Sequence, residues 1–525
     1  MVFSLLVIVV AILVYMAASF WIAEATERRA AVGKNWANNP IVYSLAIAGG
    51  LCGAWSYYGC VGLVVTQGMF YSAIYISLML CLMFGKTILS RIIKLKDTYK
   101  ITSIADFIAT RYGKSQAIAT IVTAIIVINA VPFIASQLSA VTDTTMLITG
   151  IADEHTLLSS SVRPIVAISI ILFTIIFGMR RLDPTERHPG MVVAMASEFI
   201  IRLAAWLAVG LFVVVILFGG IDGLNISFNE QLSKGFSKAP GFIEKTSIEQ
   251  VLLWLPSLVL SIAFTSSMPK NFHIVMIENH DKKHISTAMW LVPLQFFLMT
   301  IFVIPVALAG VLHCPKGITP DTYLLSLPLQ YGQSAMSLLV FVGGFSAATG
   351  MIILETVAIT TMFSNHLLMP LIESTRYLWF LRRHLLLCRW IAATVLILVS
   401  AGFELTLGKS AMLSSFGLIA STILLVFAPI FLIGLLWQRA NKVGAILGLI
   451  FGIVALFYLM IVPTLAKAGL ISQTILVNGP FGLSFLRPTA LFGLTGLPFL
   501  TNAVLWVLIF TIVPYVLGSL LYLPS

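Results

Sequence analysis

Long apolar stretches divide the chain from its first residues to its last. Each is about 20 residues long, the length that crosses a bilayer as a helix, and short polar connections separate them. The stretches are continuous rather than alternating, which excludes the strands of an outer-membrane barrel. The pattern predicts one all-α integral membrane domain over 1–525 with about thirteen transmembrane helices, near 2–26, 41–66, 71–90, 117–142, 164–182, 190–219, 250–269, 289–313, 334–368, 386–407, 412–437, 443–465 and 500–522.

Composition strengthens this interpretation. Of the 525 residues, 59% are hydrophobic and 10% are charged, with a mean hydropathy of +1.03. Soluble chains carry about 25% charged residues, so a water-soluble fold is excluded. The net charge of +11 lies mostly in short loops and contains no basic run typical of nucleic-acid binding. We therefore expect lipid rather than nucleic acid as the surrounding partner.

The basic residues also predict an orientation. Most of the 31 Lys and Arg residues fall in one set of alternate loops, including seven between Lys86 and Lys114 and, in a later loop, Lys270. By the positive-inside rule this set is cytoplasmic, and an odd number of spans then puts the N-terminus outside and the C-terminus in the cytoplasm. The first apolar run is too long for a signal peptide and should remain as a helix. The expected location is the bacterial inner membrane, in a multi-pass arrangement.

The second span contains an interruption of its apolar pattern. Three glycines, Gly49, Gly50 and Gly53, weaken the helix, and an unwound backbone there can offer carbonyls and amides to a bound solute. An aromatic and hydroxyl cluster follows and supplies solute-binding candidates: Trp55, Ser56, Tyr57 and Tyr58. The alternative is close helix packing through small residues, with the aromatic residues at the membrane interface.

The seventh span has potential breaks in the corresponding place, at Pro256 and before Pro269. It lies five spans after the second and has the opposite orientation in the membrane. Paired interrupted helices of this kind are typical of an inverted repeat of five plus five helices, with the substrate held between them. An ordinary proline kink is the alternative.

Two other spans carry polar groups that lipid-facing helices do not need. Glu198 and Arg202 lie four residues apart on one face of the sixth span and should pair. Their pairing is either static or part of gating or solute recognition. Gln137 in the fourth span is a further solute candidate, or else makes an interhelical hydrogen bond.

The ninth span combines small and hydroxyl residues over 343–351 with a carboxylate, Glu355. Small residues let helices approach, and hydroxyls can ligate a hard cation. Glu355 has no basic residue in its own span, so it is a candidate proton carrier. Alternatively, it is a protonated side chain that is hydrogen-bonded within the bundle.

The segment Thr102 to Phe107, continued by Arg111-Tyr112-Gly113, resembles the cytoplasmic signature of the sodium:solute symporter family. Other segments are similar to the symporter-like N-terminal domain of certain bacterial sensor histidine kinases: Ala54 to Gly62, Pro132 to Val141, His188 to Met191, Met268 to His273 with Glu278-Asn279, Asp321 to Pro328, and Ser346 to Pro370. This resemblance implies a LeuT-type core with repeats at about 41–219 and 250–437. It also implies a detached transporter module or a separate histidine kinase partner.

The resemblance implies a cation site as well, made by backbone oxygens near the break in the second span and by an Ala-x-x-Ser-Ser/Thr pattern in the ninth. Here Ala347 falls on the alanine, but Gly350 and Met351 fall on the hydroxyl pair. At most a weak Na⁺ site is therefore expected, and H⁺ coupling through Glu355 competes with it. The ion-coupling candidates are Gly49, Cys52, Ser346, Ala347, Thr349, Gly350 and Glu355.

Together these observations predict a secondary active transporter, an ion-coupled symporter with Na⁺ or H⁺, that moves a small organic solute by alternating access. An amino acid is the solute that the resemblance implies. The solute candidates are Trp55, Ser56, Tyr57, Tyr58, Gln137 and Glu198. The alternative is a membrane-embedded solute receptor, the sensory input module of a histidine kinase system. No HExxH, GxSxG or CxxC spacing occurs, so neither an enzyme nor an organic cofactor is expected.

Overall fold

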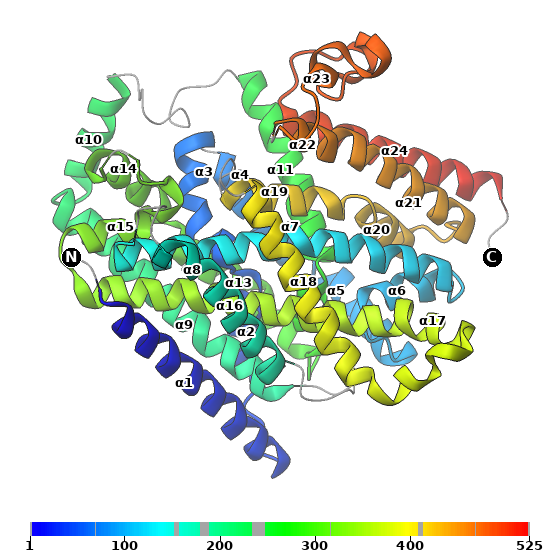
Figure 1. The fold of residues 1–525 in the computed structure, drawn as a ribbon, viewed down its shortest axis with the longest axis horizontal. Coiled ribbons are helices and arrows are strands. Elements are labelled where there is room, and N and C mark those ends of the chain that lie inside the picture. The colour runs from blue at the N-terminus through cyan, green and yellow to red at the C-terminus, as the bar shows by residue number, and fades with distance from the viewer. Residues whose placement is uncertain are drawn as a thin grey trace.

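The computed structural model describes residues 3–68, 70–151, 157–178, 188–233, 247–315, 317–407, 413–467 and 469–522, and within these ranges it is helical without strands (Figure 1). Nine helical runs in the described part are long and apolar enough to cross a membrane, or eleven if each of two bent pairs counts as one. Two shorter apolar helices, Val162–Ile176 and Trp254–Ser267, coincide with the predicted fifth and seventh spans. The all-α membrane class is thus confirmed, while the number of thirteen crossings and their orientation stay predictions.

The first half of the chain forms the helices α1 (Leu5–Ala31), α2 (Pro40–Leu51), α3 (Cys60–Gln67), α4 (Phe70–Phe84), α5 (Lys86–Tyr99), α6 (Ile104–Arg111), α7 (Gln116–Thr149), α8 (Leu157–Phe173) and α9 (Pro189–Leu211). A wide helical turn, η1 (Trp55–Gly59), joins α2 to α3. The axis turns by 77° between Pro40–Leu51 and Trp55–Gln67, so the break that the glycines predicted is present. A second bend, of 62°, separates α4 from α5.

The second half contains α10 (Ile221–Ser233), α11 (Ser247–Ser267), α12 (Pro269–Phe272), η5 (His273–Ile277), α13 (Lys283–Thr300), α14 (Val303–His313), α15 (Tyr323–Gln330), α16 (Ser334–Phe363), α17 (Met369–Ser374), α18 (Leu385–Leu407), α19 (Leu413–Leu424) and α20 (Ala428–Leu436). The last helices are α21 (Lys442–Leu456), α22 (Val462–Lys467), α23 (Thr474–Asn478) and α24 (Phe499–Leu521). Each predicted span coincides with one or more of these helices. The predicted span limits at 2, 179–182 and 412 lie outside the described residues.

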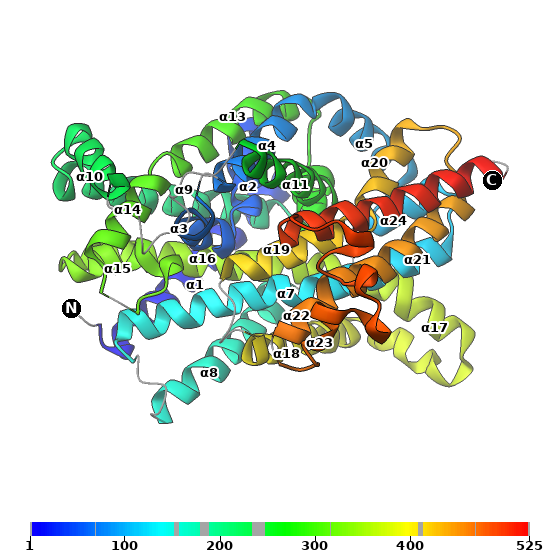
Figure 2. The same ribbon diagram turned by 90° about the horizontal axis from the view of Figure 1, so that it is seen from above.

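The centre of the bundle is formed by α7 and α16, which pack against each other and run across the middle of Figure 1. In the most apolar part of the span that contains α16, 78% of the residues are buried, whereas in that of α1, on the outer edge of the bundle, 17% are buried. Seen from above, α21 and α24 lie side by side at one end (Figure 2). Most polar residues of α7, α9 and α16 are buried against other helices, including Gln137, Glu198, Arg202 and Glu355.

Of the two breaks predicted in the seventh span, the structure has the one before Pro269 and lacks the one at Pro256. In the seventh span α11 continues through Pro256, and the chain breaks at Met268, whose backbone is extended (φ −68°, ψ 127°). Proline disfavours helix in the residue before it and suits the first position of the next helix, so Pro269 ends α11 and begins α12. In the ninth span α16 is unbroken from Ser334 to Phe363, although this segment is rich in small residues. Its glycines serve packing instead.

Candidate functional site

A small cavity lies beside the break in α2. The residues that line it come from the α2 break, α7, α11, α16 and α19: Leu51, Gly53, Trp55, Ser56, Phe133, Gln137, Phe264, Met351, Gly417 and Ser421. Three predicted solute residues, Trp55, Ser56 and Gln137, are among them. In this conformation the cavity has room for about one water molecule, so an organic solute requires it to widen.

The Gln137 side chain holds the unwound stretch in place. Its Oε1 accepts a hydrogen bond of 2.9 Å from the backbone N–H of Ala54, and its Nε2 donates to Ser136 Oγ, also at 2.9 Å. Gly53 lies directly against it, because a Cβ there would come within 2.9 Å of Met351 Cγ and 3.1 Å of Gln137 Oε1. The interhelical hydrogen bond considered for Gln137 is thus present, and the same amide faces the cavity.

Tyr57 and Tyr58 point away from the cavity. Both hydroxyls donate to the carbonyl oxygen of Val340 on α16, at 3.3 and 3.1 Å, and both rings are fully buried. The two rings occupy the space that Gly343 and Gly344 leave open, and a Cβ at either glycine would collide with them. The structure therefore gives these tyrosines a packing position, and the alternative of close packing through small residues describes them better than solute contact.

A buried lysine lies at the second break. Lys270, in α12, has no solvent exposure, and its Nζ donates to the carbonyl oxygen of Gly50 at 2.7 Å and to Asn271 Oδ1 at 2.9 Å. The ammonium is 5.0 Å from the ring centroid of Phe264 and 5.5 Å from that of Phe133, the two cavity phenylalanines. Placing Lys270 in a cytoplasmic loop was wrong, because the helix break carries the chain back into the core. Its position directly after the predicted break was the available signal.

Glu355 faces the same break. Its Oε2 accepts a hydrogen bond of 3.3 Å from the backbone N–H of Lys270, and its Oε1 is buried with no hydrogen-bond partner in the described part of the chain. The positive group close to this carboxylate is Lys270, which belongs to another helix. The sequence of the ninth span alone could not reveal it. A buried carboxyl oxygen without a partner is costly, which suits a group that changes its protonation state.

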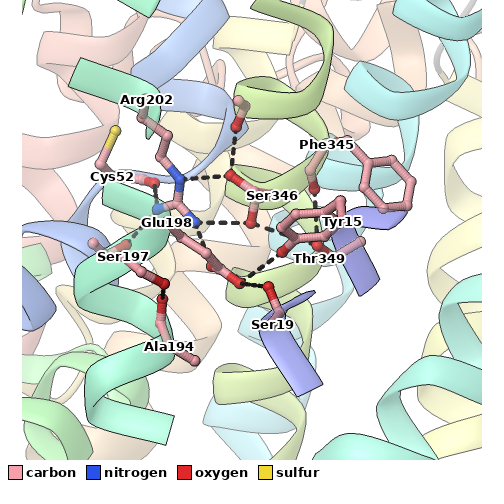
Figure 3. A network of polar contacts seen from close by, with 12 residues as sticks. Tyr15, Ser19, Cys52, Ala194, Ser197, Glu198, Arg202, Phe345, Ser346 and Thr349 are labelled. Atoms are coloured by element: carbon pink, nitrogen blue, oxygen red, sulfur yellow. Dashed lines mark hydrogen bonds and ion pairs between the residues drawn. The ribbon is translucent and has the colours of Figure 1, made fainter. Parts of the chain in front are cut away.

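The charge pair predicted on the sixth span forms, and it lies deep in the protein (Figure 3). Arg202 Nη2 is 2.8 Å from Glu198 Oε2, and Arg202 has no solvent exposure. Glu198 Oε1 accepts a hydrogen bond of 2.6 Å from the Tyr15 hydroxyl and one of 3.5 Å from Ser19 Oγ, both on α1. Glu198 does not line the cavity, so its expected contact with solute finds no support in this conformation.

Most of the predicted ion-coupling residues surround the guanidinium of Arg202. It donates to the carbonyl oxygens of Gly49 (2.8 Å), Cys52 (2.9 Å) and Ser346 (2.8 Å), and to Ser346 Oγ (3.1 Å). Gly350 lies against the ion pair. Three candidates do not contact the guanidinium: Glu355 faces the second break, Thr349 Oγ1 donates to the Phe345 carbonyl within α16, and Ala347 is a buried packing residue.

A third polar cluster connects the start of α9 with η5. Glu278 is fully buried, and its Oε1 lies 3.1 Å from His188 Nδ1 and 3.2 Å from His273 Nε2. Glu278 Oε2 also accepts a hydrogen bond of 2.8 Å from the backbone N–H of His188. One ligand atom from each residue lies within 4.8 Å of the others, so the trio is compact enough to hold a metal ion. His273 is buried within this cluster.

Glu278 lies outside the membrane-spanning segments, and its negative charge is stabilised there. Burial by itself would raise the pKa of this carboxyl, but the hydrogen bonds and charges of His188 and His273 outweigh it and lower the pKa well below the ordinary value of 4.5. The carboxylate therefore stays ionised at neutral pH and ties the two segments together.

Comparison with known proteins gives a structural likeness. No family profile and no curated protein sequence matches the chain. Among solved structures, a Na⁺-coupled sialic acid symporter in a substrate-bound, outward-open state is similar over 98% of both chains, with a TM-score of 0.64 and 13% sequence identity. At this identity the likeness shows the fold alone. The chain thus has the fold of that symporter along nearly its whole length.

Proposed function

We propose that the protein is a secondary active transporter that carries a small organic solute, an amino acid, by alternating access around the cavity. The observation that carries the proposal is the meeting of two broken helices at one cavity, with Lys270 of α12 bonded to Gly50 of α2. Irregular backbone within a membrane is tolerated only where it is buried in protein or lines a cavity. Transporters use such paired breaks to bind solute near the bilayer midplane.

The lining of the cavity suits an amino acid. None of its ten lining residues is charged, and it combines three aromatic rings with the amide of Gln137 and the hydroxyls of Ser56 and Ser421. The ammonium of Lys270 lies behind two of these rings and attracts a carboxylate. Aromatic faces suit both an apolar side chain and a cationic amino group. The resemblance of the sequence to amino-acid-linked symporter domains supports the same class.

The coupling ion is Na⁺ or H⁺. The fold is shared with a Na⁺-coupled symporter, which supports Na⁺. The carboxyl of Glu355, buried at the second break with one oxygen unpartnered among the described residues, supports H⁺. We propose symport driven by one of these gradients in a bacterial inner membrane.

Uptake by reconstituted protein tests the proposal. The purified chain in liposomes is given radiolabelled amino acids, and sialic acid for comparison, under an imposed Na⁺ gradient or an imposed pH gradient. We expect accumulation above equilibrium under at least one gradient. Trp55→Ala should raise the half-saturating concentration at least tenfold, whereas Trp379→Ala, at a side chain 62% exposed, should leave it unchanged.

Two other outcomes contradict the proposal. Solute binding without accumulation under either gradient would identify a receptor, the alternative in which the fold serves as sensory input to a separate histidine kinase. Uptake of sialic acid but of no amino acid would retain the transporter and reject the solute class.

A further inference from the structure

Carbonyl oxygens at the end of α2 point into the protein instead of into water. The last four carbonyls of a helix lack partners within it, and the helix dipole makes this end negative. Broken helices in transporters use such ends to hold a coupling cation. Here the Ala48 carbonyl accepts from the Cys52 N–H, and the Gly50 carbonyl accepts from Lys270. Two more oxygens, that of Gly49 and that of Cys52 just beyond the helix, are taken by Arg202.

The guanidinium of Arg202 uses every hydrogen-bond donor that it has. Nε donates to Ser346 Oγ, Nη1 to Gly49 and Cys52, and Nη2 to Glu198 and the Ser346 carbonyl, at 2.8 to 3.1 Å. Five N–H groups thus meet five oxygens from α2, α9 and α16. Carbonyl, hydroxyl and carboxylate oxygens are also the ligands of a hard cation such as Na⁺. A protein side chain satisfies the whole set.

Gly350 explains why the pair fits at this position. A Cβ there would lie 2.8 Å from Glu198 Oε2 and 3.3 Å from Arg202 Nη2, so any larger residue would press on the ion pair. This is the position at which the sequence lacks an expected hydroxyl ligand. The Glu198–Arg202 pair therefore depends on the absence of a side chain at Gly350.

We propose that Arg202 is a resident cation at the end of α2, which takes the place of a coupling Na⁺ and makes the solute cycle independent of Na⁺ at this position. Glu198 balances the charge, and Tyr15 of α1 completes its hydrogen bonding. Displacing a fully buried guanidinium to admit Na⁺ would leave a cation without partners, so the two do not exchange. The transport consequence rests on the proposed function, whereas the occupancy of the oxygens does not.

The test compares Na⁺ with K⁺ on the purified full-length protein without solute, by thermal unfolding and by binding of ²²Na⁺. The wild type should show no saturable stabilisation specific to Na⁺. Arg202→Ala keeps Glu198 and all the backbone oxygens, and it should gain Na⁺-specific stabilisation with at least tenfold tighter Na⁺ binding than the wild type. Arg28→Ala, which breaks an exposed Arg–Glu pair of the same four-residue spacing, should gain none.

If Arg202→Ala does not fold, Na⁺ binding to the wild type and to Ser346→Ala tests the proposal instead. Saturable Na⁺ binding by the wild type that Ser346→Ala abolishes would overturn the proposal, whereas Na⁺ binding that survives Ser346→Ala lies elsewhere and agrees with it. If no solute is taken up but the Na⁺ results hold, the proposed function fails and the role of Arg202 stands. If solute is taken up but Na⁺ binds at Ser346, the proposed function stands and the role of Arg202 fails.

Discussion

Lys270 Nζ donates a hydrogen bond of 2.7 Å to the carbonyl oxygen of Gly50, and this contact joins the break after α11 to the break after α2. A motion that separates the two broken helices must release a buried ammonium, whereas one that moves them together retains it. The contact thus connects the break beside the cavity to the second half of the chain.

Lys270→Met should destabilise the protein by about 1–3 kcal/mol, because the Gly50 carbonyl loses its donor in a buried place. Lys282→Met, at a side chain 52% exposed, removes the same charge and should change stability by less than about 0.5 kcal/mol. Denaturant or thermal unfolding in detergent measures both. Equal stability of the two variants would show that the contact between the breaks contributes nothing.

Glu355→Gln should abolish solute accumulation driven by a pH gradient while solute binding is retained, since the amide keeps the shape of the side chain but carries no exchangeable charge. Glu373→Gln, at an exposed carboxylate of α17, is the matched control and should behave as the wild type. Uptake in proteoliposomes and equilibrium binding separate the two effects. Uptake that remains unaffected by Glu355→Gln would reject a proton role for this carboxyl.

Gly417→Ala should weaken solute binding at least tenfold, because a Cβ on α19 would collide with the indole of Trp55 and force it into the cavity. Gly402→Ala adds the same methyl where nothing lies within 4 Å and should bind solute normally. Isothermal titration or scintillation proximity binding measures the difference. Normal binding by Gly417→Ala would show that the indole position is irrelevant to solute.

Glu278→Gln should reduce stability at neutral pH by about 1–3 kcal/mol, because it removes an ionised acceptor from two histidines. The folded pKa of Glu278 is lowered, so its stabilising contribution is fully present above the unfolded value of 4.5 and is lost as the pH falls through the folded value. The stability difference between wild type and variant should therefore shrink as the pH falls from 7 toward 3. Thermal unfolding across this range checks it, and a difference that grows on acidification would contradict the lowered pKa.

Several site features followed from local sequence. The glycines before Trp55 predicted the α2 break, since glycine lowers helix stability wherever it stands. The spacing of Glu198 and Arg202 predicted their pairing, because residues four apart share a helix face. Pro269 predicted an interruption near the end of the seventh span. Pro256 was an equal candidate, but α11 continues through it without a break.

Other features required contacts between distant segments. The sequence does not reveal that Tyr57 and Tyr58 turn toward Val340, because their direction depends on the space left by Gly343 and Gly344 on another helix. Lys270 has the local appearance of a loop lysine, and only the return of the chain into the core buries it.

The sequence by itself determined the all-helical membrane class, the approximate helix positions and the break in α2, because these depend on hydrophobic length and on local backbone preference. Only the tertiary structure decided which group meets the carbonyl oxygens at that break. Arg202 comes from α9, about 150 residues along the chain from Cys52, and its five hydrogen bonds form only when α2, α9 and α16 converge. Convergence of that kind is a property of packing, which local sequence patterns do not encode.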